Sequence, residues 1–221
     1  MVYTNIMSRY KLSKIYEWNG QLAYLAGLIA SDGCLINNGR HLNITSIDRE
    51  IIDYAQSILG KEKLKVQPKT GQYGTPAFAW QFSDVSLYDF FIQHGITPQK
   101  SKTIKSVDVP DEYWCDFLRG YFDGDGTVYG YFDKRWKNSF MFYCGFASAS
   151  DDFLVWLRGK NTDLIGVGKG SIRKSTRVKL LGYAKADSRL IHSAIYGDKT
   201  CSDKYSLIRK RVKFDGFINR G

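Results

Sequence analysis

Two apolar stretches that end in the same way constrain this chain more than any other feature. The first, LAYLAGLIASDGCL, covers residues 22–35 and stops at Asp32-Gly33, and the second, DFLRGYFDGDGTVY, covers residues 116–129 and stops at Asp125-Gly126. Each predicts an apolar helix that ends in an aspartate, where a carboxylate faces the negative end of the helix dipole. Because this unfavourable ending occurs twice, we expect a shared feature that compensates both carboxylates.

The segments after each helix repeat in the same order, with a period of 93 residues (125 minus 32). Apolar periodicity and turn residues predict strands in 34–38, 41–47, 63–69 and 77–83, with helices over 48–60 and 85–96. In the second half they predict strands near 126–133, 139–148, 167–174 and 177–185, with helices over 150–159 and 187–197. Asp48 is expected to cap its helix at the N-terminus and Gly60 to end it.

This pattern predicts the α+β class, with tandem pseudo-symmetric αββαββα repeats. Repetition at this scale indicates two similar subdomains. We place a first repeat, with a short N-terminal extension, at residues 1–96 and a second at 113–221. The polar segment 97–112, which carries two prolines, is the predicted linker.

The composition favours a polyanionic partner. The chain has 32 Lys and Arg against 22 Asp and Glu, a formal net charge of +10. A balance of this kind is typical of proteins that bind nucleic acid, and sometimes of those that bind acidic membrane surfaces. No apolar run approaches the roughly 18 residues of a membrane span, so membrane residence is not expected.

The cysteines and histidines argue against a structural zinc site and a disulfide framework. The chain has three histidines and four scattered cysteines without a CxxC pair, namely Cys34, Cys115, Cys144 and Cys201. We expect the cysteines to be small buried apolar residues in a reducing intracellular compartment, either a prokaryotic cytoplasm or an organelle.

Small residues recur along one face of each apolar helix and predict that the two helices pack on each other. They are Ala23, Gly27 and Ala30 in the first and Gly120 and Gly124 in the second. Parallel packing would bring Asp32 and Asp125 together, and two carboxylates about 4 Å apart repel by about 4 kcal/mol at an effective dielectric of 20. A divalent cation removes that conflict, and oxygen ligands select Mg²⁺, Mn²⁺ or Ca²⁺ rather than zinc.

Gly33 and Gly126 are expected to end these helices in the left-handed conformation. The plain alternative is that each Asp-Gly pair only forms a turn.

The two stretches resemble the paired signature motifs of the LAGLIDADG homing endonucleases, in the two-motif, single-chain form. The motifs are LAGLIASDG (25–33) and LRGYFDGDG (118–126); GITPQKSKTI (95–104) and the tail YSLIRKRVKF (205–214) extend the resemblance over nearly the whole chain. The first motif has Ala30 where the family usually has an acid. The second keeps Asp123 there, which we expect to be a polar residue at the helix end.

The resemblance implies a DNA-binding, metal-dependent hydrolase. It implies two saddle-shaped antiparallel β-sheets along the DNA major groove, with the signature helices between them in a monomer of pseudo-two-fold symmetry. Asp32 and Asp125 would bind Mg²⁺, with the carbonyls of Ser31 and Gly124 completing its coordination. Mn²⁺ is expected to replace Mg²⁺, and Ca²⁺ to support binding without cleavage. The expected product is a double-strand break with 3′ overhangs in a long target.

The resemblance also implies accessory residues around the acids. By position, Lys100 and Lys210 are expected near the scissile phosphates, and Ser46 and Ser148 are expected to order water. Many relatives have glutamine in that second role. The alternative for Lys100 is an ordinary solvated linker lysine.

Base reading is expected from the hairpins, because arginine and lysine suit guanine edges and asparagine and glutamine suit adenine. Arg173, Lys174 and their strand partners are expected on one basic, aromatic-flanked sheet face, with a solvated charged face as the alternative. Because the halves differ in sequence, the target should be asymmetric. The candidates are Asn37, Arg40, Asn43, Lys65, Gln67, Lys69, Gln81, Tyr129, Tyr131, Lys134, Arg135, Lys137, Arg173, Arg177 and Lys179.

Two other functions are compatible with these motifs: an RNA maturase that aids intron splicing, and a DNA-binding protein on the same scaffold that does not cleave. Degenerate relatives typically lose the motif acids, and both acids are present here. That favours the enzyme. The chain ends FINRG, without a His-Asn splice junction, which favours an intron-encoded or free-standing enzyme over an embedded intein domain.

Overall fold

The computed structural model describes residues 14–71, 74–135, 139–197 and 205–220, and it confirms the predicted α+β class. In the first half the order of elements is α1 (Gly20–Ser31), β1 (Gly33–Leu35), β2 (His41–Ser46), α2 (Arg49–Leu59), β3 (Gln67–Thr70), β4 (Pro76–Ser83) and α3 (Val85–Gln93). In the second half it is α4 (Trp114–Asp125), β5 (Gly126–Phe132), β6 (Phe140–Ser148), α5 (Asp151–Ile165), β7 (Ser171–Lys174), β8 (Lys179–Tyr183), α6 (Lys185–Tyr196) and α7 (Ile208–Arg220).

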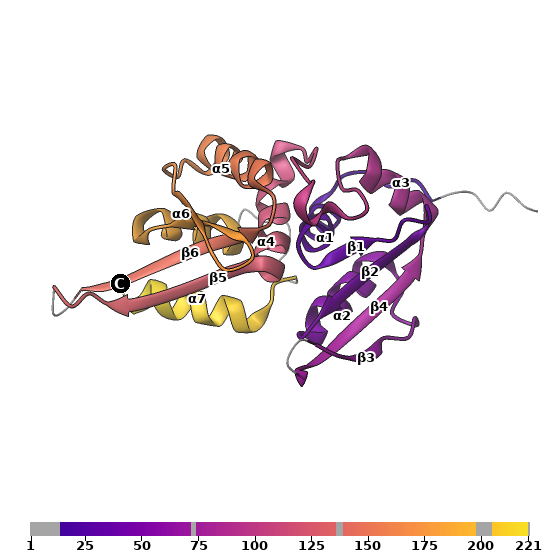
Figure 1. Cartoon of the computed structure of the whole chain (residues 1–221), viewed down its shortest axis with the longest axis horizontal. Coiled ribbons are helices and arrows are strands. Elements are labelled where there is room, and N and C mark those ends of the chain that lie inside the picture. The colour runs from indigo at the N-terminus through magenta and orange to yellow at the C-terminus, as the bar shows by residue number, and fades with distance from the viewer. Residues whose placement is uncertain (1–13, 72–73, 136–138, 198–204, 221) are drawn as a thin grey trace, which may run out of the picture.

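Each half forms one four-stranded antiparallel sheet, and the two sheets have the same topology. The strand order is β1-β2-β4-β3 in the first sheet and β5-β6-β8-β7 in the second. Figure 1 shows the sheets on either side of a central pair of helices, α1 and α4. A single cluster of buried apolar residues runs through both halves. The αββαββα order is therefore present twice, around one shared centre.

Local signals account for several helix ends. The side chains of Asn19, Asp84 and Ser150 accept hydrogen bonds from backbone N–H groups in the first turns of α1, α3 and α5. Gly60 ends α2 in the left-handed conformation, as predicted, with a φ of 65°. Gly166 ends α5 in the same way, so this helix runs past Gly159, the predicted end, to Ile165.

Helices α1 and α4 approach closely at three glycines, two of which meet the backbone of the other helix and the third a side chain. A Cβ atom on Gly27 would lie 2.2 Å from the Phe117 carbonyl oxygen, and one on Gly120 would lie 2.0 Å from the Tyr24 carbonyl oxygen. A Cβ on Gly124 would lie 2.0 Å from Oγ of Ser31. Because Tyr24 lies opposite Gly120 and Ser31 lies opposite Gly124, the helices run parallel and their C-terminal tips meet, as predicted.

Gly33 and Gly126, which follow the acids, are required because a Cβ atom would clash there, and not because the backbone is left-handed. Gly126 has a φ of −78°, and Gly33 is not among the described residues with positive φ. A Cβ on Gly33 would lie 2.6 Å from Cα of Ile29, and one on Gly126 would lie 2.4 Å from the Phe122 carbonyl oxygen. The chain therefore leaves each helix by folding tightly against its own last turn, and the prediction of a left-handed terminator was wrong.

We expect Gly120→Ala to destabilise the protein by at least about 3 kcal/mol, the upper end of the usual cost of overpacking. The new methyl group would meet backbone atoms of Tyr24, which cannot rotate away, so the helices must separate. The free energy of unfolding, measured in urea, tests this.

Gly159→Ala is the matched control. Gly159 also lies inside a helix, but a Cβ atom added there would meet nothing within 4 Å in the rest of the described chain. This variant should be neutral or up to about 1 kcal/mol more stable. Equal stabilities for the two variants would contradict the close packing of α1 on α4.

The last helix, α7, was not predicted from the sequence. The tail was identified only as basic and as similar to the family's C-terminal region, yet residues 208–220 form a helix. Figure 1 shows α7 beside β5, with its first turn directed towards the centre of the molecule.

No helix within the described ranges has the length and apolar character needed to cross a bilayer.

Candidate active site

The two motif acids lie at the meeting point of the paired helices. Asp32 follows directly after α1, and Asp125 is the last residue of α4. A Cβ built on Gly124, the neighbour of Asp125, would lie 3.4 Å from the carboxyl carbon of Asp32. The small size of Gly124 therefore lets the two tips approach each other.

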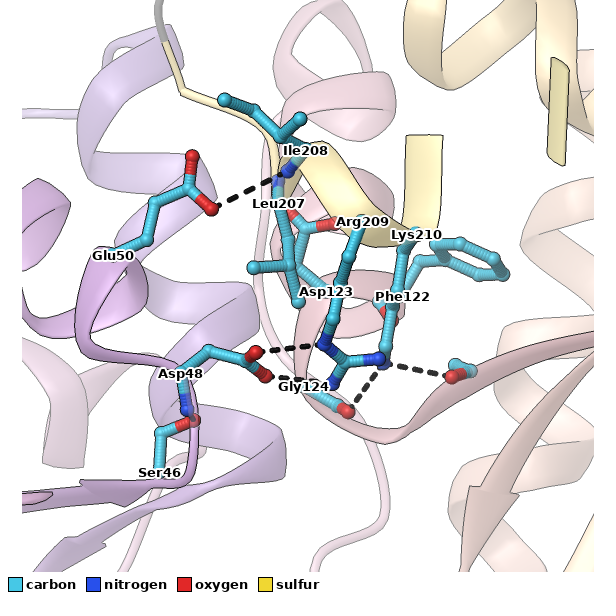
Figure 2. A network of polar contacts seen from close by, with 11 residues as sticks. Ser46, Asp48, Glu50, Phe122, Asp123, Gly124, Leu207, Ile208, Arg209 and Lys210 are labelled. Carbon is cyan, nitrogen blue, oxygen red and sulfur yellow. Dashed lines mark hydrogen bonds and ion pairs between the residues drawn. The ribbon is translucent and has the colours of Figure 1, made fainter. Parts of the chain in front are cut away.

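Lys100 and Lys210 hold the two tips in closely similar ways. The Lys100 ammonium donates hydrogen bonds to the carbonyls of Gly33 at 2.7 Å and Ser31 at 3.5 Å. The Lys210 ammonium donates to the carbonyls of Gly126 and Gly124, both at 2.7 Å, and to Phe122 at 2.8 Å. Each lysine thus bonds the carbonyls on both sides of one motif acid (Figure 2 shows Lys210).

Both lysines are nearly inaccessible to solvent, with 4% of Lys100 and 9% of Lys210 exposed. The alternative of a solvated linker lysine is therefore wrong for Lys100. A cation at the end of a helix also interacts favourably with the negative end of the dipole, so each ammonium compensates part of the cost of its acid.

Burial and like charge disfavour ionisation of the acids. Burial and, to a smaller extent, the Asp125 carboxylate raise the pKa of Asp32 to about 7, against the opposing effect of Lys210 and Lys100. Burial also raises the pKa of Asp125. On the cationic side, burial lowers the pKa of Lys210 to about 8, and it lowers the pKa of Lys100. Burial therefore disfavours the charged form of both acids and of both lysines.

We expect Asp32→Asn to stabilise the metal-free protein at high pH. Since the pKa of Asp32 is raised on folding, the folded state binds the proton more tightly than the unfolded state, and stability falls as pH rises from about 4 to about 7. Asparagine at this position cannot ionise, so the variant does not lose this stability as the pH rises. Unfolding in a chelator should show the variant more stable by on the order of 3 kcal/mol at pH 8 and no more stable at pH 4.

The matched control is Asp53→Asn, an exposed position on α2, which should keep the wild-type pH dependence. Adding Ca²⁺ at pH 8 should stabilise the wild-type protein and leave the Asp32→Asn variant unchanged. A variant less stable than the wild type at pH 8 would contradict the predicted cost of ionising Asp32.

The residues present fit a magnesium-type cation. Among the described residues, no group of three or more His, Cys, Asp and Glu side chains could cage a metal. Mg²⁺ does not need such a cage, since it usually keeps several waters and binds one or two carboxylates together with substrate phosphates. Asp32, Asp125 and the adjacent carbonyls of Ser31 and Gly124 offer only oxygen atoms, which suit Mg²⁺, Mn²⁺ or Ca²⁺.

Ser46 and Ser148 occupy equivalent places at the ends of β2 and β6. Each is buried, and each hydroxyl oxygen accepts a hydrogen bond of 3.1 Å from the backbone N–H two residues later, on Asp48 and on Ser150. That bond fixes the direction of the hydroxyl.

Ser148 also lines a cavity of about 190 Å³ beside Asp125. Lys100 and Tyr121 line the same cavity, and the Tyr121 hydroxyl donates a hydrogen bond of 2.6 Å to the Ala147 carbonyl. Tyr121 was not predicted as a site residue, because its aromatic ring is typical of the apolar helix in which it lies. The cavity lining includes Asp125 but not Asp32.

Asp123 anchors the segment that carries Lys210. Its carboxylate accepts hydrogen bonds from the Tyr24 hydroxyl at 2.8 Å and from the Leu207 backbone N–H at 2.9 Å. It is buried, and burial raises its pKa to about 6. The residue expected to be only a polar helix end therefore joins α1, α4 and the start of α7.

The DNA-contact candidates that lie on strands of the first half share one sheet face. Asn43 lies opposite Gln81, while Gln67 and Lys69 lie opposite Ala79 and Ala77 of β4. Paired residues of antiparallel strands point to the same side, and here that side is opposite to the buried side chains of Leu42, Ile44, Trp80 and Phe82. Asn37 and Arg40 lie in the β1–β2 turn and Lys65 in the loop before β3, all exposed.

The second sheet presents aromatic rings and one arginine on its outer face. Tyr129 and Tyr131 stack on Tyr143, with ring centroids 5.3 and 6.0 Å apart. Arg173 and two of these rings, Tyr129 and Tyr143, line a cavity of about 210 Å³ on this face. Lys174 pairs with Lys179 in the register of the opposite face, so the expectation that Arg173 and Lys174 share one surface was wrong.

The remaining basic candidates differ in whether their side chains are free to contact DNA or already paired with a carboxylate. Arg135 makes a two-point ion pair with Asp133 and lowers the pKa of that carboxyl to about 2, and Lys179 pairs with Asp151. Lys134 and Arg177 are exposed, and Lys137 lies outside the described residues. Among the cysteines, Cys144 is buried as expected, but Cys34 is exposed on β1.

The comparisons with known proteins agree with this architecture. Residues 19–78 match the model of the LAGLIDADG-like domain family. The LAGLIDADG meganuclease I-AabMI, solved bound to uncleaved DNA, is 13% identical with a TM-score of 0.56 and coverage of 91% of this chain and 90% of that one. The homing endonuclease I-LtrWI, bound to target DNA, is 10% identical with a TM-score of 0.58 and coverage of 90% of both chains.

The fold is also shared by a protein that is not described as a nuclease. The N-terminal LAGLIDADG domain of DUF199/WhiA is 12% identical, with a TM-score of 0.55 and coverage of 88% of this chain and 86% of that one. No curated protein matches the chain. At these identities the likeness concerns the fold, with both repeats carried on a single chain.

Proposed function

We propose that this chain, a LAGLIDADG protein in the two-motif, single-chain form, is a site-specific DNA endonuclease. It would cut both strands of a long asymmetric target in a reaction that requires a divalent metal, and leave 3′ overhangs. The observation that carries the proposal is the meeting of two part-buried acids at the parallel tips of α1 and α4, between the two sheets. With two acids side by side, each acid can serve the cleavage of one strand of the same duplex.

Each polar group of the site has a proposed role. Asp32 and Asp125, with the carbonyls of Ser31 and Gly124, would hold Mg²⁺. The bound ion would activate a water and stabilise the leaving oxygen. Lys100 and Lys210 would fix the position of the acid-bearing turns through their carbonyl bonds and add positive charge near the scissile phosphates. Ser46 and Ser148, whose hydroxyls are already oriented, would position water.

The two outer sheet faces would read the DNA. The first offers amide side chains and a lysine, which suit adenine edges, guanine edges and phosphates. The second offers stacked tyrosines and Arg173. These faces differ chemically, which supports an asymmetric target, and both repeats lie on one chain, which supports a monomer.

The proposal is tested with the target obtained by joining the DNA that flanks the gene's mobile element, or by selection from a randomised duplex library. The protein should convert a plasmid with this site to linear DNA with Mg²⁺ or Mn²⁺, and the ends should carry 3′ overhangs. Chelation by EDTA should abolish cutting, and Ca²⁺ should restore binding alone.

Two results would overturn the assignment. Tight binding of the selected duplex without any cleavage under Mg²⁺ or Mn²⁺ would identify a DNA-binding protein on the same fold. Preference for a structured intron RNA over every duplex would identify a maturase.

A further inference from the structure

Asp48 lies at the N-cap of α2, but its carboxylate makes no hydrogen bond to that helix. Its two oxygens instead accept hydrogen bonds of 2.6 Å from Nε and from a terminal nitrogen of Arg209, the second residue of α7. By contrast, the N-cap side chains of Asn19, Asp84 and Ser150 do accept bonds from their own helices. Asp48 therefore forgoes the usual role of an N-cap side chain and binds the guanidinium.

The Asp48–Arg209 ion pair lies beside the Asp32 side of the candidate site. A Cβ on Gly124, the residue next to the guanidinium, would lie 3.4 Å from the carboxyl carbon of Asp32, and the Asp48 backbone N–H donates the hydrogen bond to Ser46. Arg209 directly precedes Lys210, whose ammonium bonds the Gly124 carbonyl, and Figure 2 shows the guanidinium next to Gly124.

The Asp125 side has no equivalent ion pair at the matching positions. Ser46 and Ser148 make the same hydrogen bond to the residue two places later, so the position of Asp48 corresponds to Ser150. Lys100 and Lys210 hold equivalent turns, so the position of Arg209 corresponds to Gln99. Beside Asp125 lies the cavity of about 190 Å³ lined by Lys100 and Ser148. A cavity thus lies beside Asp125, and a charged pair lies beside Asp32.

We propose that Arg209 binds a DNA phosphate in the half of the site that contains Asp32, and that its ion pair with Asp48 prevents this contact at first. Arg209 must exchange the Asp48 carboxylate for the phosphate before Asp32 takes part in cleavage. The strand over Asp125 is then cut first, and the strand over Asp32 is cut second. This inference rests on the proposed endonuclease function for the order of cutting, but the exchange of Arg209 can be tested by binding alone.

The exchange replaces the two hydrogen bonds from Arg209 to a carboxylate by two hydrogen bonds to a phosphate. A guanidinium presents two parallel N–H donors, which fit the two oxygens of a carboxylate and two oxygens of a phosphate equally well. Half of the Arg209 side chain is exposed (53%), so water and DNA can reach it, and ion pairs at such exposure are weak. No bond other than hydrogen bonds is made or broken.

Binding of duplex DNA in Ca²⁺ tests the exchange through a double-mutant cycle. Asp48→Asn keeps a side chain suited to the N-cap and releases Arg209. Affinity should rise several-fold, and the dependence of log K on log salt should steepen by about 0.9, the value of one phosphate contact. In an Arg209→Gln background the same substitution should change neither quantity.

The matched control is Asp53→Asn, which removes the same charge from the same helix and releases the exposed Arg49. Its effect on DNA affinity and on the salt dependence should be small, and should be the same with arginine or glutamine at position 209. An effect of Asp48→Asn that persists in the Arg209→Gln background would overturn the proposed exchange.

Plasmid cleavage tests the order of cutting. Nicked circles should accumulate before linear DNA, with the break always in the same strand. Asp48→Asn should speed the second cut and leave the rate of the first unchanged. Equal rates for the two strands, or acceleration of the first cut, would overturn the inference. If no condition yields any cutting, the proposed endonuclease function and the cutting order both fail, whereas the binding cycle still decides whether Arg209 exchanges.

Discussion

Replacing Asp125 or Asp32 by asparagine is expected to reduce double-strand cleavage at least 10³-fold, a loss of about 4 kcal/mol of transition-state stabilisation. Asparagine keeps the shape of the side chain but removes the charge that would hold the cation. The turn after each helix should survive, because Lys100 and Lys210 bond backbone carbonyls rather than these carboxylates. Binding in Ca²⁺ should therefore remain within a few-fold of the wild-type value.

The control for this experiment is Asp89→Asn, which removes a charge from an exposed position on α3. It should cleave at the wild-type rate. Wild-type cleavage by either site variant would mean that the acids are not catalytic. A large loss of Ca²⁺-supported binding in either site variant would mean that the acids act mainly in folding or DNA binding.

DNA affinity is expected to fall by roughly 10³ to 10⁵ between 50 and 200 mM salt. If six to ten phosphates are contacted, the slope of log K against log salt should lie between about −5 and −9. The charge that drives this fall is the formal +10 of the chain. Fluorescence anisotropy of a labelled target in Ca²⁺ at several salt concentrations gives the slope directly.

Gln81→Ala provides the matched control for the salt experiment. Gln81 lies on the outer face of the first sheet opposite Asn43 and carries no charge, so its loss should lower affinity without changing the slope. A wild-type slope shallower than about −2 would contradict an extended phosphate interface and favour a few local contacts.

The features of this fold that were predictable depend on repetition and on simple periodicity. The small residues of α1 and α4 predicted a parallel pair whose tips meet, and the structure confirms it through Gly27, Gly120 and Gly124. The element order was also predictable, because alternating and helical patterns are local. The boundaries of the two repeats at residues 96 and 113 stay a prediction.

Other features depend on distant contacts that the sequence does not display. The conformation of Gly33 and Gly126 follows from how tightly the chain folds against Ile29 and Phe122, which no local pattern specifies. Asp48 reads as an ordinary N-cap, and only the folded chain brings it to Arg209, 161 residues later. The bonds from Lys100 and Lys210 to the carbonyls beside the acids were likewise not predictable, although both lysines were identified by position.

Localised radical cleavage detects directly whether Asp32 and Asp125 together hold a divalent cation at the DNA backbone. Fe²⁺ replaces Mg²⁺ in the protein bound to duplex DNA at low salt, ascorbate and peroxide are added, and the protein fragments are mapped by mass spectrometry. A cation site shared by the two acids predicts cuts beside residues 31–33 and 124–126 that disappear in both Asp→Asn variants and on addition of excess Mg²⁺. Cuts confined to other parts of the chain, or cuts at the tips that persist in the variants, would contradict it.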